Sequence, residues 1–599
     1  MKLHSTNKQH LLQAALGRVP CDLLIKNANL VNVITGEIYR ANVFVDSGMI
    51  AHVEHRDLAA DLEKANQVID AEGRYLIPGF IDAHIHIESS MMTPRNFARA
   101  VIPWGTTTVI TDPHEIANVW GLEGVRYMHE ASRDLPMRQL LDIPSCVPAV
   151  PGVEHSGAAF LAPEIHELSR LDRVIGLAEV MDFAGVAQGD SRMMDIIKAA
   201  EDHGLYLQGH APGQTGRILS AYRCGGPNTC HETSDSEEAL EKLRSGMFVD
   251  ARDSSILKNV KAIWNGVKDV RFFDQLCFCT DDREADEILQ HGHVNDVVRS
   301  AISCGMDPVA AIKSATYNTA REAHIENLGA VAPGFAADFL LVDDLRRLKP
   351  SHVFFAGRLV AEQGTMTVEI PDAEFPLERR NSVCVRELTA DDFVLKAPVQ
   401  DGSAAINLLE YPDPVAVVTV RSKARVEVRD GRVLLDQPDL KYVAVVNRYP
   451  GYDTIGLGVV RGFGTHTGAL ASTVSHDSHN LTIVYDTPEN ALLAAQELIR
   501  CGGGMCAVEN GSVLHTLELP LAGLMSLKPA EELAACCQAM KNAERRLGLT
   551  AQENPLLRIV TLALPVVPTL KMTDLGMVDV LRKELVPLLA EGREAPSAP

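Results

Sequence analysis

Two histidines that stand two residues apart, His84 and His86, follow an apolar run that opens at Pro78-Gly79. Alternate residues of an extended strand face the same side, so both imidazoles can be offered to one metal ion. A His-x-His pair by itself is more often two ordinary polar side chains. Its position favours metal binding, because enzymes built as barrels of parallel strands keep their active sites at the carboxyl ends of those strands.

Histidines and acids end other apolar runs in the same way. Glu179 closes Gly-Leu-Ala-Glu, His210 follows Gln-Gly, and Asp281 follows Cys-Phe-Cys-Thr. Each such group, if buried without a partner, would cost several kcal/mol, whereas a shared metal site satisfies them all. The pattern therefore predicts a centre of two metal ions that share one carboxylate, and a mixed set of histidines and acids suits Zn, Fe or Mn rather than Ca. The predicted ligands are His84, His86, Glu179, His210, His231 and Asp281.

The segments that carry these residues alternate between strand and helix character. Eight apolar strands with helical connections fit an α/β fold of the (β/α)₈ type, in which parallel strands are buried on both faces. The predicted strands are Leu76–Ile87, Thr106–Thr111, Arg138–Pro144, Val174–Val180, Leu205–His210, a short run near Asn228–His231, Met247–Ala251 and Leu276–Thr280.

The barrel is predicted to span 73–328, and the residues on either side of it have a different sequence pattern. Residues 1–21 are predicted to be a helical extension, with helical periodicity over 5–18. Short β-type runs precede and follow the barrel, so we expect one split, β-sandwich-like domain to be completed from both ends. A C-terminal α+β domain is expected beyond it, and the tail from Glu591 to Pro599 is expected to be disordered. The split domain is assigned to 22–72 and 329–375 and the C-terminal domain to 376–599.

Charge and cysteine usage narrow the class of partner. The 599 residues carry a net charge of −23, and the short basic runs are interrupted by acids. Such a chain repels nucleic acid and anionic membrane surfaces, so a small-molecule partner is expected. The start of the chain lacks the apolar core of a signal peptide, no apolar stretch reaches bilayer-spanning length, and the 12 cysteines form no paired framework. We therefore expect a cytoplasmic protein with reduced thiols.

Longer motifs resemble a known family. The order of histidines and carboxylates after the strands resembles the amidohydrolase superfamily and, more narrowly, the adenine deaminases. The motifs are Pro-Gly-Phe-Ile-Asp-Ala-His-Ile-His-Ile-Glu-Ser-Ser-Met-Met-Thr-Pro (78–94), Thr-Asp-Pro-His-Glu-Ile-Ala-Asn-Val (111–119), Gly-His-Ala-Pro-Gly (209–213) and His-Asp-Ser-His-Asn (476–480). The resemblance implies that Glu179 bridges the two ions, where many relatives carry a carboxylated lysine. Cys230, directly before His231-Glu232, differs from the motif that is most common in the family.

The resemblance implies hydrolytic deamination of adenine to hypoxanthine and ammonia, as in purine salvage, by a homo-oligomer with two divalent ions. Mn or Fe is the expected metal, with Zn as the alternative. A water activated between two metals would attack C6 of adenine, and Asp281 would carry the proton to the departing amine. Glu232 is the first candidate for donating a proton to the ring nitrogen, against a structural role. Candidates for substrate contact or for support of the ligands are Asp112, His114, Glu115 and Asp282.

Two other functions remain open. A cyclic amide hydrolase would use the same chemistry, but a carboxylated lysine would favour it and Glu179 does not. A catalytically silent scaffold of the same fold should have lost at least one ligand, and none is missing. The segment 476–480 is either a second metal site, an element that reaches a barrel mouth, or ordinary surface or interface polarity.

Overall fold

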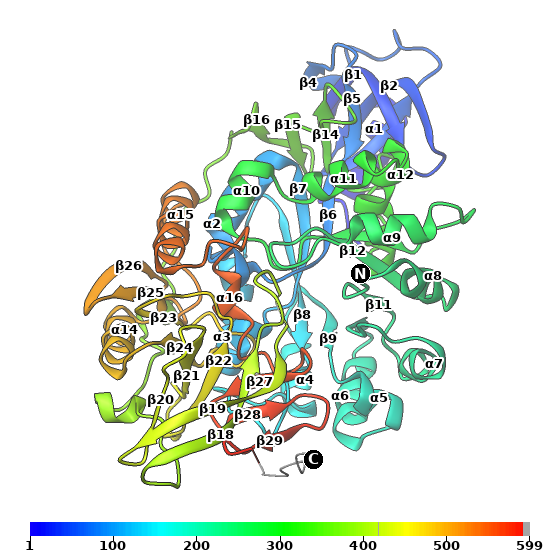
Figure 1. Cartoon of the computed structure of the whole chain (residues 1–599). Helices are drawn as coiled ribbons and strands as arrows, with labels where there is room; N and C mark the ends of the chain where they lie inside the picture. Colours follow the sequence, from blue (N-terminus) through cyan, green and yellow to red (C-terminus); the bar gives the residue numbers. More distant parts are fainter. Residues whose placement is uncertain (417, 591–599) are drawn as a thin grey trace. The chain divides into compact units, whose positions relative to one another are not determined.

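The computed structural model describes residues 1–416 and 418–590, and the tail that was expected to be disordered lies outside them. The chain divides into two compact units, each built from several segments. The first comprises 1–113, 128–145 and 161–373, and the second comprises 114–127, 146–160 and 374–599 (Figure 1). Among the described residues, no helix combines the length and apolarity needed to cross a membrane.

The first unit contains eight parallel strands in chain order. Five form one sheet in the order β10-β9-β8-β7-β6, and three form a second in the order β11-β12-β13. An isolated bridge between Ile85 and Asp281 joins the end of the first strand to the end of the last. The curled parallel sheet is that of a TIM-type domain. The strands are β6 (Phe80–Ile85), β7 (Thr106–Thr111), β8 (Arg138–Pro144), β9 (Val174–Val180), β10 (Tyr206–Gly209), β11 (Thr229–Cys230), β12 (Phe248–Arg252) and β13 (Leu276–Cys279).

The strand predicted at Leu76–Ile87 is wrong in its extent. The structure has two strands there, β5 (Tyr75–Pro78) and β6, which belong to different sheets. Gly79 stands between them, and a Cβ at this position would lie 2.4 Å from Oγ1 of Thr107. The chain therefore changes sheets at a glycine because only a residue without a side chain fits against the neighbouring strand.

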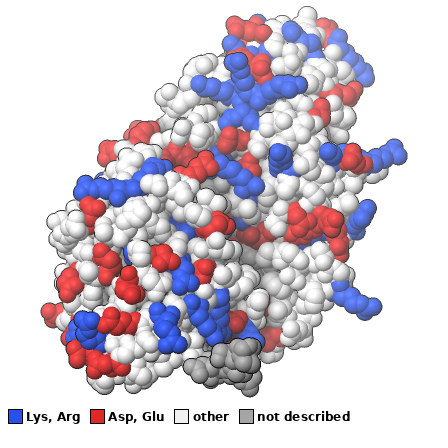
Figure 2. Space-filling view, in the orientation of Figure 1, with Lys and Arg blue, Asp and Glu red and all other residues white. Residues whose placement is uncertain are grey.

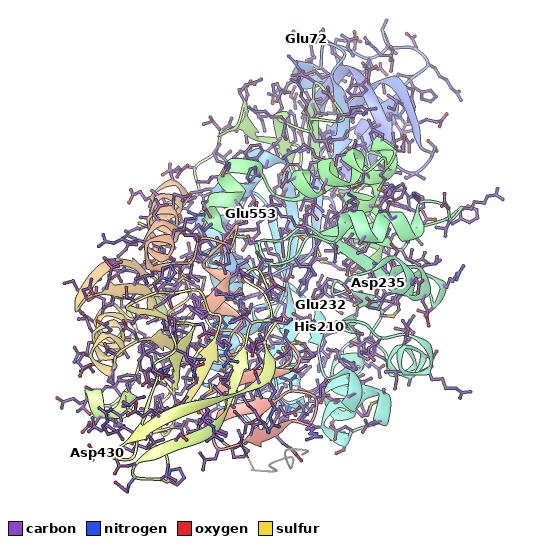
Figure 3. All side chains as sticks on the ribbon, viewed as in Figure 1. Glu72, His210, Glu232, Asp235, Asp430 and Glu553 are labelled. Carbon is purple, nitrogen blue, oxygen red and sulfur yellow. The ribbon has the colours of Figure 1, made fainter. Side chains whose placement is uncertain are left out.

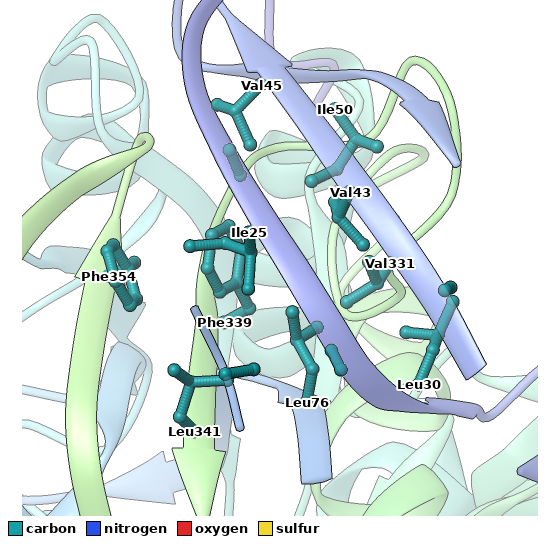
Figure 4. Close-up of a cluster of buried hydrophobic side chains, with 14 of the residues drawn as sticks. Ile25, Leu30, Val43, Val45, Ile50, Leu76, Val331, Phe339, Leu341 and Phe354 are labelled. Atoms are coloured by element: carbon teal, nitrogen blue, oxygen red, sulfur yellow. The ribbon is translucent and has the colours of Figure 1, made fainter. Parts of the chain in front are cut away.

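A third sheet of the first unit takes strands that precede and follow the parallel strands in the sequence. Its order is β17-β16-β15-β14-β5-β1-β2-β3, with β4 beside β1, and β5 runs antiparallel to β14. Its apolar core includes Leu76, Val331 and Phe339 (Figure 4). The remaining strands are β1 (Cys21–Asn32), β2 (Glu37–Asp46), β3 (Met49–Glu54), β4 (Ala65–Asp70), β14 (Phe339–Val342), β15 (Pro350–Phe355), β16 (Arg358–Glu362) and β17 (Thr365–Met366).

Helices connect the strands of the first unit. The N-terminal helix is shorter than its predicted range, because the side chain of Asn7 caps it by accepting the N–H of His10. The helices are α1 (Lys8–Ala15), α2 (Pro94–Val101), α4 (Ala162–Leu168), α5 (Phe183–Gln188), α6 (Ser191–Asp202), α7 (Gly216–Cys224), α8 (Ser236–Arg244), α9 (Val260–Val267), α10 (Ala285–His291), α11 (Val294–Ser303), α12 (Pro308–Lys313) and α13 (Thr319–Glu322), with short turns η1 (Ile87–Ser90), η2 (Ile102–Trp104) and η3 (Ser314–Asn318).

The second unit is built on a sheet of order β20-β19-β18-β22-β21-β24-β23-β25-β26, and β27, β28 and β29 form a smaller sheet. The buried alanines of α14 pack against the larger sheet. The strands are β18 (Gly402–Glu410), β19 (Val420–Arg429), β20 (Arg432–Leu434), β21 (Leu440–Val446), β22 (Ile455–Arg461), β23 (Ala469–Ser472), β24 (Leu481–Tyr485), β25 (Gly504–Glu509), β26 (Ser512–Glu518), β27 (Leu570–Thr573), β28 (Gly576–Asp579) and β29 (Glu584–Val586). The helices are α3 (His114–Ala131, as far as residue 127), α14 (Pro488–Cys501), α15 (Ala530–Leu547) and α16 (Leu557–Val560), with turns η4 (Pro376–Arg379) and η5 (Ala390–Phe393).

Acidic and basic side chains are intermixed over the face shown in Figure 2. Exposed acidic and basic side chains of the chain also form ion pairs, as Lys198 does with Asp202 one helical turn away at 2.9 Å. Exposed pairs of this kind contribute little to stability. The mixed charges of the face shown are typical of an ordinary solvated surface.

Candidate metal centre

The first two predicted ligands come from the end of β6 and are oriented by hydrogen bonds behind them. The Nε2 atoms of His84 and His86 lie 3.1 Å apart. Nδ1 of His84 lies 2.6 Å from Oε1 of Gln208, whose amide nitrogen donates to the carbonyl of Ala83, so this ring donates from Nδ1. Nδ1 of His86 donates to the carbonyl of Asp112 at 2.9 Å. Both Nε2 atoms are thereby left as acceptors, the form in which imidazole binds a metal.

Glu179, at the end of β9, faces two pairs of histidines with its two oxygens. Oε1 lies 3.7 Å from Nε2 of His84 and 3.4 Å from Nε2 of His86. Oε2 lies 3.1 Å from Nε2 of His231 and contacts Nδ1 of His210. A carboxylate that presents one oxygen to each of two donor pairs has the arrangement of a bridge between two metal ions.

The second histidine pair follows β10 and β11. The peptide N–H of His210 donates to the hydroxyl of Tyr222, and that hydroxyl donates to the carbonyl of Val180, which fixes the backbone after β10 against the end of β9. The ring of His231 stacks on that of His84 with centroids 4.0 Å apart. The rings of the two pairs therefore lie in direct contact across the centre.

Asp281 stands after β13 and turns its carboxylate toward the first histidine pair. Oδ1 lies 3.3 Å from Nε2 of His86 and 3.8 Å from Nε2 of His84, and the Asp281 peptide N–H donates to the carbonyl of His84. Asp282 is directed elsewhere, because its Oδ1 accepts the hydroxyl of Ser89 at 2.5 Å. The structure thus brings together six side chains, called the strand-end cluster below: His84, His86, Glu179, His210, His231 and Asp281.

Arg252 is a residue of this site that the sequence reasoning missed. It ends β12, and its guanidinium contacts Oδ2 of Asp281 and lies 2.8 Å from Oε1 of Glu232. Glu232 is half-buried beside His210 (Figure 3) and lies 3.7 Å from His231. The available signal was a charged residue directly after the predicted strand Met247–Ala251, the same position that identified the histidines and acids.

Asp112 supports the cluster, and the other two residues of its motif lie in the second unit. Oδ2 of Asp112 accepts the peptide N–H of Glu179 at 2.9 Å, so Asp112 holds the backbone of the bridging residue as well as the ring of His86. His114 and Glu115 begin α3, and within the second unit His114 lies near Asp477 and Glu115 lies near His476.

Burial and neighbouring charges set the protonation of the residues in the cluster. Burial, together with the neighbouring histidines, holds the pKa of His84 well below its usual range and keeps this ring neutral. Burial alone would raise the pKa of Glu179, but His210 and His231 hold it well below its usual range, so this carboxylate is ionised. Burial lowers the pKa of His210, yet the charge of Glu179 outweighs it and raises the value to about 9. His84 is therefore a neutral ring ready to bind a cation, whereas His210 holds a proton beside the ionised Glu179, and a metal ion bound there would displace that proton.

Two parts of the chain match known protein families. Residues 75–360 match the amidohydrolase family, and residues 416–584 match the adenine deaminase C-terminal domain. Parallel strands that end in histidines and carboxylates agree with the first match, which makes the first unit an amidohydrolase domain.

Full-length relatives narrow this class. An adenine deaminase of Moorella thermoacetica is 41% identical over 97% of this chain and 98% of its own. Those of Bacillus velezensis, at 39% identity over 97% and 100%, and of Paracoccus denitrificans, at 40% over 97% of each, match as completely. The chain belongs to the adenine deaminase family.

Proposed function

We propose that this chain deaminates adenine to hypoxanthine and ammonia at the strand-end cluster, with two divalent metal ions held there. One observation carries the proposal: the two oxygens of Glu179 face separate histidine pairs. The family supports the substrate, since relatives that match over nearly their whole length are adenine deaminases. Manganese or iron is the proposed metal, with zinc as the alternative, because histidines and carboxylates together suit these ions.

The metal ions would supply a water that is nucleophilic near neutral pH at C6 of the purine. Asp281 is placed to take the proton from this water, since its Oδ1 is the oxygen turned toward His84 and His86. The same carboxyl group would then deliver the proton to the amine that leaves C6. Arg252 contacts the other oxygen of Asp281 and so holds the carboxylate in one orientation.

Glu232 is the proposed donor to the ring nitrogen next to C6, which gains electron density as C6 becomes tetrahedral. It shares Arg252 with Asp281, so the two carboxyl groups are held in a fixed relation. Burial alone would raise the pKa of Glu232, but Arg252, His210 and His231 together lower it. An added proton on this residue would therefore have to accompany substrate binding. Asp112 is proposed to position Glu179 and His86, and Asp282 to position Ser89.

The setting of the reaction is part of the proposal. We include in it a small-molecule purine substrate, a cytoplasmic location, a homo-oligomeric state and a role in purine salvage. The family supports the purine substrate, and the net charge of −23 favours a small-molecule partner over nucleic acid. Hydrolysis of a cyclic amide is the rival reaction, because the same nucleophile opens C–N bonds in rings.

One experiment separates these functions. The purified chain, with its metal content measured, is incubated with adenine, other 6-aminopurines, dihydroorotate and hydantoin. We expect ammonia and hypoxanthine from adenine, loss of metal and turnover together in Glu179→Gln, and neither loss in Glu237→Gln, whose side chain is exposed on α8. Ring opening of a cyclic amide without ammonia from adenine would establish the rival. Two ions bound at the strand-end cluster without turnover of any of these compounds would indicate a catalytically silent scaffold.

A further inference from the structure

A second group of histidines and carboxylates lies in the second unit. His114 and Glu115 open α3, and His476 and Asp477 lie between β23 and β24. We call these four residues the α3 cluster. All four are buried, with at most 6% of any of them exposed. The proposed reaction gives the segment 476–480 no role, although it is one of the most distinctive motifs of the sequence.

Three distances between members of the α3 cluster are longer than hydrogen bonds and close to the separation of metal ligands. Nε2 of His114 lies 3.7 Å from Oδ1 of Asp477, and Nδ1 of His476 lies 3.8 Å from the same oxygen. Nδ1 of His476 lies 3.6 Å from Oε1 of Glu115. Hydrogen bonds between nitrogen and oxygen span 2.7–3.2 Å. Donors at 2.0–2.1 Å from a tetrahedral ion are about 3.4 Å apart, so small movements would let these atoms share one cation.

His476 is the residue that joins the group. It forms one metal-compatible set with His114 and Asp477 and another with Glu115 and His479, and in each set the ligand atoms lie within 4.8 Å of one another. Nδ1 of His479 accepts the peptide N–H of Ser475 at 3.2 Å. Its Nε2 therefore carries the hydrogen in the neutral ring, which makes His479 a donor toward the other members rather than a ligand. That Nε2 is buried and has no hydrogen-bond partner among the described residues.

The backbone around the cluster is held in place before any ion binds. The N–H of His476 donates to the carbonyl of Val560, and that of His479 donates to the carbonyl of Ser475. The side chain of Asn480 accepts the N–H of Arg448. On the other side, the amide of Asn118 donates to the carbonyl of His114, one turn back in α3. A site held in this way loses little conformational entropy when it binds an ion.

Charge also favours a cation. The cluster contains two buried carboxyl groups, those of Glu115 and Asp477. Oδ2 of Asp477 is buried without a hydrogen-bond partner among the described residues. Buried carboxylates are costly unless they are paired or bind a metal.

We propose that the second unit binds one divalent metal ion of its own through His114, His476 and Asp477, with Glu115 as the fourth ligand. Two imidazoles and two carboxylates select zinc, manganese or iron over calcium or magnesium. This ion is additional to the two proposed for the strand-end cluster, and its ligands are different residues.

Metal counting tests the proposal on the full chain. Protein freed of metal by chelation is titrated with Mn²⁺ or Zn²⁺, and bound metal per chain is measured by mass spectrometry. We expect three ions in the unaltered protein and two in His476→Asn and in Asp477→Asn. The matched control is His466→Asn, an exposed histidine of the same unit, which should keep three. Circular dichroism of each variant shows whether it is folded, and the two independent variants guard against the misfolding of one.

A complementary variant isolates the additional ion. The double substitution His84→Asn and His86→Asn weakens the strand-end cluster and should leave the ion of the α3 cluster bound. Saturation of the unaltered protein at two ions, or three ions in both His476→Asn and Asp477→Asn, would overturn the proposal. Complete loss of metal in the double variant would do the same. A chain that binds three ions but releases no ammonia from adenine would refute the proposed function and leave this inference standing.

Discussion

Replacing Asp281 by asparagine separates metal binding from proton transfer. The substitution leaves one side-chain oxygen, which can still face His86, from which Oδ1 is 3.3 Å away, and puts an amide nitrogen in place of the Oδ2 that Arg252 contacts. It removes the group that takes the proton from water. Since general acid–base contributions are about 10²–10⁴-fold, the barrier should rise by roughly 3–5 kcal/mol. We expect kcat for hypoxanthine formation to fall by that factor while KM changes far less.

Asp282→Asn is the matched control, because it is the same substitution one residue further on. Asp282 is half-buried and accepts a hydrogen bond from Ser89, and asparagine can keep that bond. Its kcat should stay within a few-fold of the unaltered protein. Both variants are assayed for hypoxanthine with metal content measured in parallel. A severe loss in Asp282→Asn together with near-normal turnover in Asp281→Asn would show that the wrong aspartate was assigned.

Three further predictions concern residues that the sequence did not single out. Gln208→Leu removes the acceptor for Nδ1 of His84, so metal affinity should fall about 10–100-fold in a chelator competition, and an unchanged affinity would contradict the orienting role. Arg252→Met should lower kcat more than it raises KM, because it frees the carboxylates of Asp281 and Glu232; a change in KM alone would count against this. Burial lowers the pKa of Lys571 to about 7, so the unfolded chain binds more protons between pH 7 and 10.5 and stability should rise across that window. Urea unfolding of Lys571→Met should show a shallower rise, and an identical pH profile would refute the attribution.

Strand positions could be predicted from the sequence because buried parallel strands leave continuous apolar runs. The predicted Thr106–Thr111, Arg138–Pro144 and Val174–Val180 are the observed limits of β7, β8 and β9. The limits of Leu76–Ile87 were wrong, since apolarity does not reveal that the chain leaves one sheet and enters another at Gly79. That change depends on the close approach of Thr107, which is distant in sequence.

The candidate ligands were predictable and the groups that orient them were not. A histidine or acid that ends an apolar run is visible in the sequence, as at Glu179 and Asp281. The partner of a ring nitrogen is set by packing between strands: Gln208 reaches His84 across 124 positions of the chain. Arg252 was overlooked because a basic residue at a strand end was not considered as a partner for the acids of neighbouring strands.

The relation between the first and last parallel strands shows how such distant contacts set the geometry of the site. The described strands β6 and β13 share no continuous ladder, only the bridge between Ile85 and Asp281. The buried side chain of Asp82 adds two hydrogen bonds there, accepting the N–H of Thr280 at 3.0 Å and its hydroxyl at 2.6 Å.

Histidine 293 completes this network from behind the strands. His293 lies within hydrogen-bond distance of Thr280 and, through its other nitrogen, of Thr106 on β7. Burial holds the pKa of His293 well below its usual range, so the ring is neutral and can donate to one hydroxyl while it accepts from the other. Asp82 precedes His84 by two residues, and Thr280 precedes Asp281 by one. The network therefore fixes the distance between a proposed ligand of one strand and the proposed proton carrier of another. Backbone pairing alone would hold these two strand ends together through a single bridge.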